Sequence, residues 1–153
     1  MAERTVKHDI VVQERRLKAT PARVFRAWSN PDERRKWDVP GNGWVLAEFR
    51  QDFRVGGVEM SRFGPPGEAR YYSEGHYLSI APDSRIISAG VMHDGNTPMT
   101  ATMLTVEFYP DGSGTRLVLT DQSAYFGMEK ASDRQEGWGE ILTKLAAALG
   151  ESA

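Results

Sequence analysis

Cysteine is absent from this 153-residue chain, and its absence excludes several kinds of chemistry at once. Without thiols there is no disulfide framework, no cysteine nucleophile and no zinc site built on cysteine ligands. Long apolar runs are absent too, so the sequence predicts no segment that crosses a bilayer. The amino-terminal stretch MAERTVKHDI also lacks the apolar centre of a signal peptide. These absences predict a cytoplasmic protein.

A large excess of one charge is also missing. The chain has 19 Lys and Arg against 21 Asp and Glu, for a formal net charge of -2 at pH 7. This balance gives no long-range attraction to nucleic acid or to an anionic membrane, so we expect neither nucleic-acid binding nor membrane insertion. Hydrophobic residues make up 40% of the chain, which is enough for one core. We therefore expect a single domain over residues 6–150, with flexible termini at 1–5 and 151–153.

The clearest pattern that is present is a helical one, over residues 132–149. Its apolar positions recur every three or four residues and form one stripe, made of Trp138, Ile141, Leu142, Leu145 and Leu149. Ser132 is a candidate N-cap with Gln135 completing a capping box, and Gly150 suits a left-handed C-cap. Inside this helix Gly137 and Gly139 flank a tryptophan, and each glycine costs about 1 kcal/mol relative to alanine. We predict that these small residues allow the helix backbone to approach the sheet closely, and that Trp138 forms part of the wall of a cavity between helix and sheet.

The rest of the chain predicts one strand, two short helices and six strands. The expected strands are Val6–Leu17, Trp44–Phe53, Val58–Phe63, Arg70–Ile80, Arg85–His93, Thr100–Tyr109 and Thr115–Thr120. Both short helices open with a capping residue followed by proline, Thr20-Pro21 and Asn30-Pro31. Tight turns between the strands favour an antiparallel sheet. The sequence therefore predicts an α+β domain in two layers, with the sheet curled around the long helix.

Four short motifs, in this order and spacing, resemble a known family. They are RRLKATP leading into VFRAW (residues 15–28), Asn30-Pro31 followed by Trp37, RVGG (residues 54–57) and Gly137-Trp138. The chain resembles the START/Bet-v-1-like (SRPBCC) superfamily, and most of all the branch named after the activator of heat-shock protein 90 ATPase. The resemblance implies the helix-grip fold, in which a curved seven-stranded antiparallel sheet wraps a long C-terminal helix and two short helices follow the first strand.

The resemblance also implies a cavity between sheet and helix, which members of the superfamily use for lipids, hormones or polyketides. Our first hypothesis is therefore a protein that binds an apolar ligand, lipid-like or aromatic, and needs no cofactor. A second is an enzyme of the cyclase or hydratase type, in which Glu74 or Asp121 acts as acid or base. A third is a protein-interaction module of the co-chaperone type. A homodimer through an edge strand is compatible with each of them.

Methionine, aromatic and mid-strand polar residues are the candidate lining of that cavity, because soft side chains suit an adaptable apolar site. The candidates are Trp37, Met60, Tyr72, Glu74, His76, Met92, Met103, Tyr125, Phe126 and Trp138. An ordinary core would use the same residue types, and Trp28 fits that role. The sequence leaves open which face of each strand points inward, because one bulge reverses it.

A metal site has weaker support. Glu74 and His76 share a face of one strand, and His93 lies on the next strand. The geometry therefore allows a site made of two histidines and a carboxylate. The alternative is that His93 ends a strand beside a turn while His76 packs or faces solvent. We predict no metal.

Overall fold

The computed structural model describes residues 5–151; most of the predicted flexible termini, residues 1–4 and 152–153, lie outside the described part. The elements follow the order expected from the sequence. They are β1 (Lys7–Leu17), α1 (Pro21–Ser29), α2 (Pro31–Arg34), β2 (Val45–Gln51), β3 (Val58–Gly64), β4 (Tyr71–Ala81), β5 (Arg85–Asp94), β6 (Thr97–Asp111), β7 (Gly114–Tyr125) and α3 (Ala131–Ala148).

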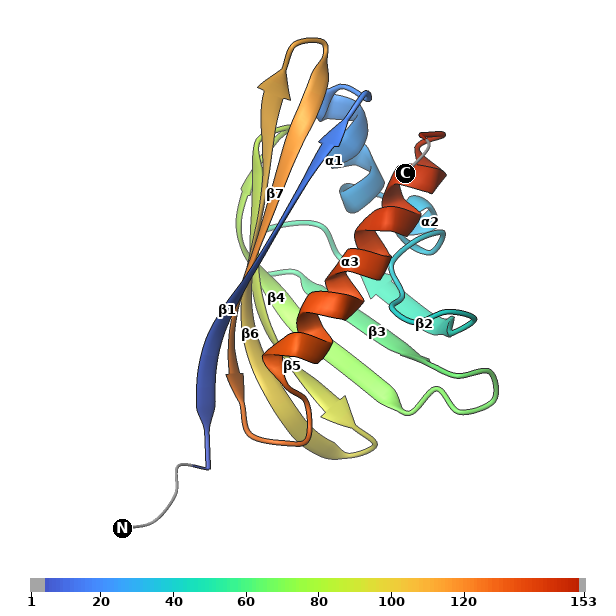
Figure 1. Ribbon diagram of the computed structural model, residues 1–153, viewed down its shortest axis with the longest axis vertical. Coiled ribbons are helices and arrows are strands. Elements are labelled where there is room, and N and C mark those ends of the chain that lie inside the picture. Colours follow the sequence, from blue (N-terminus) through green and yellow to red (C-terminus); the bar gives the residue numbers. More distant parts are fainter. Residues whose placement is uncertain (1–4, 152–153) are drawn as a thin grey trace.

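All seven strands form one antiparallel sheet in the order β1-β7-β6-β5-β4-β3-β2. The sheet is strongly curved, and α3 runs diagonally across its concave side, while α1 and α2 cover one end (Figure 1). The predicted helix-grip architecture is confirmed. Its two layers follow from the sequence, because a sheet with one apolar face and a helix with one apolar stripe must bury them against each other.

Side-chain caps begin the two short helices as predicted. The Thr20 hydroxyl accepts the Arg23 amide at 3.2 Å. The Asn30 carboxamide oxygen accepts the amides of Asp32 and Glu33 at 2.9 and 3.1 Å. These bonds satisfy amide groups that have no partner within the first helical turn.

The cap of α3 differs from the predicted one. Lys130 is the N-cap, and its amide donates to the carboxylate of Asp133 at 3.0 Å, so Ser132 lies inside the helix and does not cap it. An acidic residue in the first turn also suits the helix dipole. At the other end Gly150 has a φ of +79° and the Glu151 amide donates to the carbonyl of Ala146, as a left-handed C-cap requires.

Strand β7 is longer than expected, since it continues past Thr120 to Tyr125. Both of its neighbours, β1 and β6, pair with it over this extension. Asp121 and Tyr125, which follow the predicted end of this strand, therefore lie on β7 and pair with strands on both sides.

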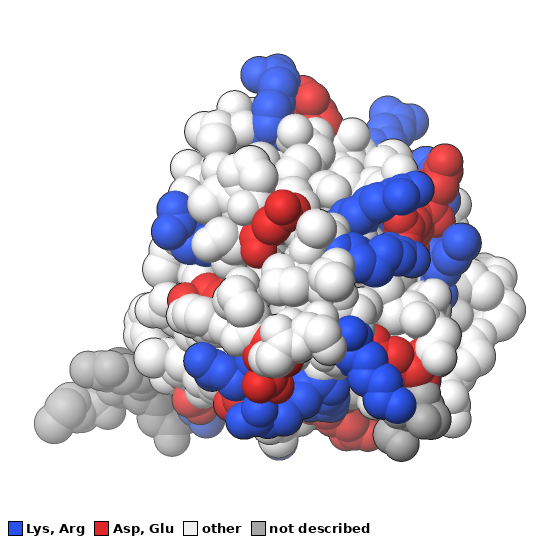
Figure 2. Space-filling model, turned by 90° about the horizontal axis from the view of Figure 1, so that it is seen from above, with Lys and Arg blue, Asp and Glu red and all other residues white. Residues whose placement is uncertain are grey.

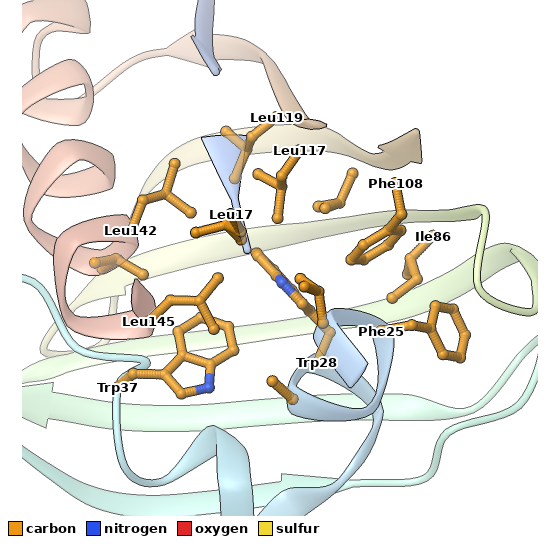
Figure 3. Close-up of a cluster of buried hydrophobic side chains, with 14 of the residues drawn as sticks. Leu17, Phe25, Trp28, Trp37, Ile86, Phe108, Leu117, Leu119, Leu142 and Leu145 are labelled. Carbon is orange, nitrogen blue, oxygen red and sulfur yellow. The ribbon is translucent and has the colours of Figure 1, made fainter. Parts of the chain in front are cut away.

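The hydrophobic core fills the end of the molecule that α1 covers, and we call this region the filled end (Figure 3). Trp28 lies at its centre and packs edge-on against Trp37 and Phe108, with ring centroids 4.7 and 6.4 Å apart. The other labelled members are Leu17, Phe25, Ile86, Leu117, Leu119, Leu142 and Leu145. Strands β1, β5, β6 and β7 and helices α1 and α3 all contribute, so this cluster ties the two layers together.

The molecular surface agrees with the balanced charge. On the face seen from above, acidic and basic side chains are interspersed (Figure 2). In the described part of the chain, none of the helices has the length and apolarity needed to span a membrane.

Candidate functional site

A cavity of about 580 Å³ lies between α3 and the concave face of the sheet, beyond the filled end. Strands β3 to β6 form its floor, α3 forms one wall and the loop of residues 38–44 forms another. Exposed residues of the segment before α3 and of its first turns, such as Met128, Asp133 and Glu136, border the cavity, so it opens to solvent there. Its volume falls within the range of small-molecule sites, roughly 300–1,000 Å³.

The cavity exists because five of the inward-facing residues of its floor are small. Ser61 on β3, Ser73 and Gly75 on β4, and Ser88 and Gly90 on β5 all line it. A bulky side chain at these positions would reach toward α3, as Ile86 and Phe108 do at the filled end. The space is therefore left by the sequence of three adjacent strands.

The two floor glycines have a second role, because they allow two strands to approach closely. Gly75 and Gly90 face each other across β4 and β5. A Cβ atom added to Gly90 would lie 2.4 Å from the carbonyl oxygen of Glu74, and one added to Gly75 would lie 2.6 Å from that of Ala89. Both contacts are shorter than atoms tolerate, so glycine is required at both positions for the two strands to approach this closely.

Aromatic and other apolar side chains form most of the remaining lining. Trp44 stacks on Tyr71 with centroids 5.5 Å apart, and Phe63 packs beside both rings. Met92, Met99, Leu104, Trp138 and Ile141 complete the apolar surface. Such a lining suits a ligand with an aromatic or aliphatic body.

One polar group, which we call the Arg134 cluster, lies at the α3 wall. The Arg134 guanidinium contacts the carboxylates of Glu129 and Asp121 at 2.7 and 3.2 Å and the Thr102 hydroxyl at 3.2 Å. Asp121 is fully buried, and it also accepts a hydrogen bond from the Trp138 indole N–H at 2.8 Å and one from the hydroxyl of Ser123. With these partners, Asp121 anchors α3 to the sheet.

A second group, which we call the Arg34 cluster, separates the cavity from the filled end. Arg34 is 5% exposed, and its guanidinium lies over the rings of Trp28 and Trp37. It contacts the carboxylates of Asp38 and Glu59 at 2.5 and 2.7 Å. Two carboxylates thus share one guanidinium at the cavity wall.

This arrangement changes the protonation equilibria of the Arg34 cluster. Burial raises the pKa of Asp38; the Arg34 guanidinium opposes the shift and Glu59 adds to it. Burial also raises the pKa of the Tyr77 hydroxyl, and Glu59, which accepts a hydrogen bond from that hydroxyl at 2.5 Å, adds to the rise. Despite burial, the two carboxylates keep the pKa of Arg34 above its ordinary value, so this residue stays charged.

The loop of residues 38–44 is fastened to α3 by polar contacts. The Lys144 ammonium donates to the carbonyl oxygens of Val39 and Gly41 at 2.7 and 2.8 Å. Glu140 accepts the Gly41 amide at 3.4 Å. These bonds hold one cavity wall in place.

Two of the ten residues predicted to line the cavity do so in the structure, Met92 and Trp138. Trp37 is fully buried in the filled end, and the buried Tyr125 and the exposed Phe126 lie outside the lining at the end of β7. The remaining five, Met60, Tyr72, Glu74, His76 and Met103, lie on the convex face of the sheet, because they alternate with the lining residues along β3, β4 and β6.

These placements bear on the candidate acid–base and metal residues. Glu74 is exposed on the convex face, where its carboxylate accepts the Tyr72 hydroxyl at 2.8 Å. Asp121 faces inward, but arginine, tryptophan and serine partners occupy its oxygens. No three acidic or histidine side chains within residues 5–151 are placed to hold a metal ion.

Several lining residues were not singled out from the sequence, namely Arg34, Glu59, Ser61, Ser73, Ser88, Trp44, Phe63, Tyr71 and Arg134. One signal was available for the serines and aromatics. On β4 the positions 71, 73, 75 and 77 alternate with 72, 74, 76 and 78, and only the first set contains the small residues that a cavity needs. For the arginines there was no local signal, since their partners come from other elements.

The glycines of α3 need a revised explanation. A Cβ atom on Gly137 would lie 3.5 Å from Pro40, and one on Gly139 would lie 3.7 Å from the side chain of Gln13. Both are ordinary contact distances, so close approach does not require either glycine. Gly137 lines the cavity opposite the 38–44 loop, where a larger side chain would narrow the space.

The chain is similar to known proteins over nearly its whole length. A crystal structure from Rhizobium loti shares 41% identity and covers 94% of this chain and 98% of its own, with a TM-score of 0.83. An uncharacterized protein from Rhizobium leguminosarum shares 33% identity over 95% and 96% of the two chains, with a TM-score of 0.84. An AHSA1-like protein from Aeromonas hydrophila has the same fold at 22% identity, covering 93% and 92%, with a TM-score of 0.74.

No curated protein matches the sequence significantly. The family model described as "Activator of Hsp90 ATPase homolog 1-like protein" matches residues 18–150, a range that includes both short helices, six of the seven strands and α3. With the helix-grip fold and the cavity between sheet and helix, this match shows that the chain belongs to the AHSA1-like family of the SRPBCC superfamily.

Proposed function

We propose that this protein binds a small molecule with an apolar or aromatic body in the cavity between α3 and the sheet. The observation that carries the proposal is the cavity itself, about 580 Å³ of space inside a domain whose other half is tightly packed. Interiors of folded proteins are close-packed and lose stability when space is left empty. A large space kept open by five small residues on adjacent strands is therefore best explained by an occupant.

The lining supports this proposal in two ways. Its apolar part, which includes Trp44, Phe63 and Met92, would gain roughly 25 cal/mol per Å² of apolar surface removed from water when a ligand binds. Its polar part includes the hydroxyls of three serines, for which the described residues show no hydrogen bond. Apolar walls with a few polar groups are the usual composition of small-molecule sites.

The test measures binding of N-phenyl-1-naphthylamine, a neutral dye that fluoresces when removed from water, to the intact chain. We expect saturable binding to the unchanged protein and much weaker binding to Ser88→Leu, whose larger side chain extends from the floor into the cavity. Thr105→Leu is the control, because position 105 lies on the convex face and receives the same leucine side chain there.

Two outcomes would contradict the proposed function. Binding that survives Ser88→Leu at full strength contradicts the proposal, since the dye then sits elsewhere. Absence of dye binding, together with native mass spectra of freshly purified protein that show only the bare chain, also contradicts it. Circular dichroism checks that both variants keep their fold.

A further inference from the structure

The charges that line the cavity are strongly unequal, although those of the whole chain are nearly balanced. Two basic side chains line it, Arg34 and Arg134. Seven acidic side chains line it, and they are Asp38, Glu59, Asp94, Glu129, Asp133, Glu136 and Glu140. The inference that follows rests on the proposed function and concerns the charge of the ligand.

Both guanidinium groups are already neutralised by the protein. Arg34 contacts Asp38 and Glu59, each within 2.7 Å. Arg134 contacts Glu129 and Asp121, within 3.2 Å. A carboxylate or phosphate on a ligand would have to displace one of these partners and leave a carboxylate in the protein without its cation, which is costly at a buried site.

Two carboxylates, by contrast, form no ion pair. Asp133 and Glu136 take part in none among residues 5–151, and they lie in the first two turns of α3 at the cavity. Glu59 shares Arg34 with Asp38, so the Arg34 cluster keeps an excess of one negative charge when both carboxylates are ionised. The mouth and one wall of the cavity thus carry uncompensated negative charge.

The uncharged polar and aromatic lining is compatible with a cation as well. The hydroxyls of Ser61, Ser73 and Ser88 can accept hydrogen bonds from an ammonium group. The stacked rings of Trp44 and Tyr71 present π-electron surface, which attracts cations within about 6 Å of a ring centroid. An anion would gain from neither the carboxylates nor the ring faces.

We infer that the cavity selects ligands that join an apolar or aromatic body to a positively charged amine, and that it discriminates against carboxylate-bearing ligands of the same size. The apolar body lies against Phe63, Met92 and Leu104, and the amine lies toward the acidic side chains of α3. An acidic, partly enclosed site attracts cations before contact and stabilises them after it.

The experiment compares three probes with the same twelve-carbon chain. Dodecylamine is protonated at pH 7, dodecanol is neutral and dodecanoate is negative, and each is titrated below its micelle concentration as a competitor of the bound dye. We expect dodecylamine to bind at least ~10-fold more tightly than dodecanoate, with dodecanol between them. Raising the salt concentration should weaken dodecylamine binding and leave dodecanol binding nearly unchanged.

Variants locate the effect at the cavity. Asp133→Asn with Glu136→Gln removes two charges from α3 at the cavity, and asparagine keeps an oxygen that can accept the Lys130 amide. We expect a roughly 5-fold loss of dodecylamine affinity with dodecanol affinity unchanged. The control is Glu14→Gln with Glu107→Gln, which removes the same charge from the convex face, where both residues pair opposite Val118. We expect less than about a 2-fold change there.

Each outcome decides one question. If dodecanoate competes as well as dodecylamine, the charge selectivity is refuted while the proposed binding function stands. An equal loss of affinity in both double variants also refutes it, because the effect would then come from overall charge. If the dye binds but none of the three probes displaces it, the inferred preference for amines is refuted, while the proposed function still rests on dye binding.

Discussion

The filled end and the open cavity are built from the same strands and the same helix, yet one is packed and the other is hollow. Strand β5 shows the difference within a few residues: its inward positions run from buried Ile86 through Ser88 and Gly90 to Met92. At the filled end α1 adds Phe25 and Trp28 between the layers. The contrast shows that side-chain size at alternate strand positions, rather than the fold, decides where this domain keeps space.

The largest expected effect comes from making the same substitution at both ends. Trp28→Ala removes a ring that is 2% exposed and packed between Trp37 and Phe108. We expect a loss of about 3–5 kcal/mol in the free energy of unfolding, measured by chemical denaturation. Trp44→Ala, at the partly exposed cavity wall, should cost clearly less. Equal losses at the two positions would show that the cavity end carries as much packing energy as the filled end.

The second prediction compares glycines in the cavity floor and in the helix. Gly90→Ala places a Cβ atom 2.4 Å from a backbone carbonyl oxygen, and we expect it to destabilise the protein by roughly 1–3 kcal/mol. Gly139→Ala meets only ordinary contacts and should stabilise it by up to about 1 kcal/mol through helix propensity. Thermal denaturation of the two single variants shows whether each substitution lowers or raises the stability of the fold. A stable Gly90→Ala protein would show that the strands can separate without cost.

The third prediction concerns Trp138, which borders both the filled end and the cavity. Its ring packs on the core cluster and lines the cavity, and its indole N–H donates to buried Asp121. Trp138→Phe keeps most of the ring but removes this donor, so we expect a loss of roughly 1–2 kcal/mol in denaturation experiments. Asp121→Asn in the same background tests the coupling. If the losses of unfolding free energy from the two substitutions simply add, the hydrogen bond contributes no coupling energy between the residues.

The smallest effect is a pH dependence at the boundary formed by the Arg34 cluster. Because the pKa of Asp38 is raised in the folded protein, this carboxyl contributes stability that is present below about pH 3.9 and is lost as pH rises through the folded-state value. Asp38→Asn removes that contribution. Denaturation between pH 4 and 7 should therefore show the unchanged protein losing stability relative to the variant as pH rises. A constant difference across this range would contradict the assigned shift.

Much of the local structure follows from the sequence. The proline after Thr20 and after Asn30, the stripe on α3 and Gly150 each act through their immediate neighbours, so their roles could be predicted. The pairing of β2 to β7 in succession also follows, because short turns join these strands, whereas the pairing of β1 with β7 was not predicted. The cap of α3 was misplaced by two residues, since Asp133 accepts the Lys130 amide in place of the expected serine cap.

The cavity lining could be predicted only in part, because it depends on which face of each strand points inward. Register shifts interrupt β2 between Leu46 and Glu48, β4 between Tyr77 and Ser79, and β6 at Met99, opposite Met92 and His93 of β5. Each one breaks the simple alternation. Methionine and aromatic residues were the expected signal, yet Met60 and Tyr72 lie on the convex face. The more useful signal was the small residues, which mark where volume is missing.

By itself, then, the amino-acid sequence determined the elements, the N-caps of α1 and α2 and the two-layer architecture, because these depend on propensity and periodicity over a few residues. Only the tertiary structure decided that Arg34 and Arg134 are each held by two carboxylates, and that seven acidic side chains gather around one cavity. Those groups come from strands, loops and helices far apart in the chain. Their common environment arises only when the sheet curls around α3.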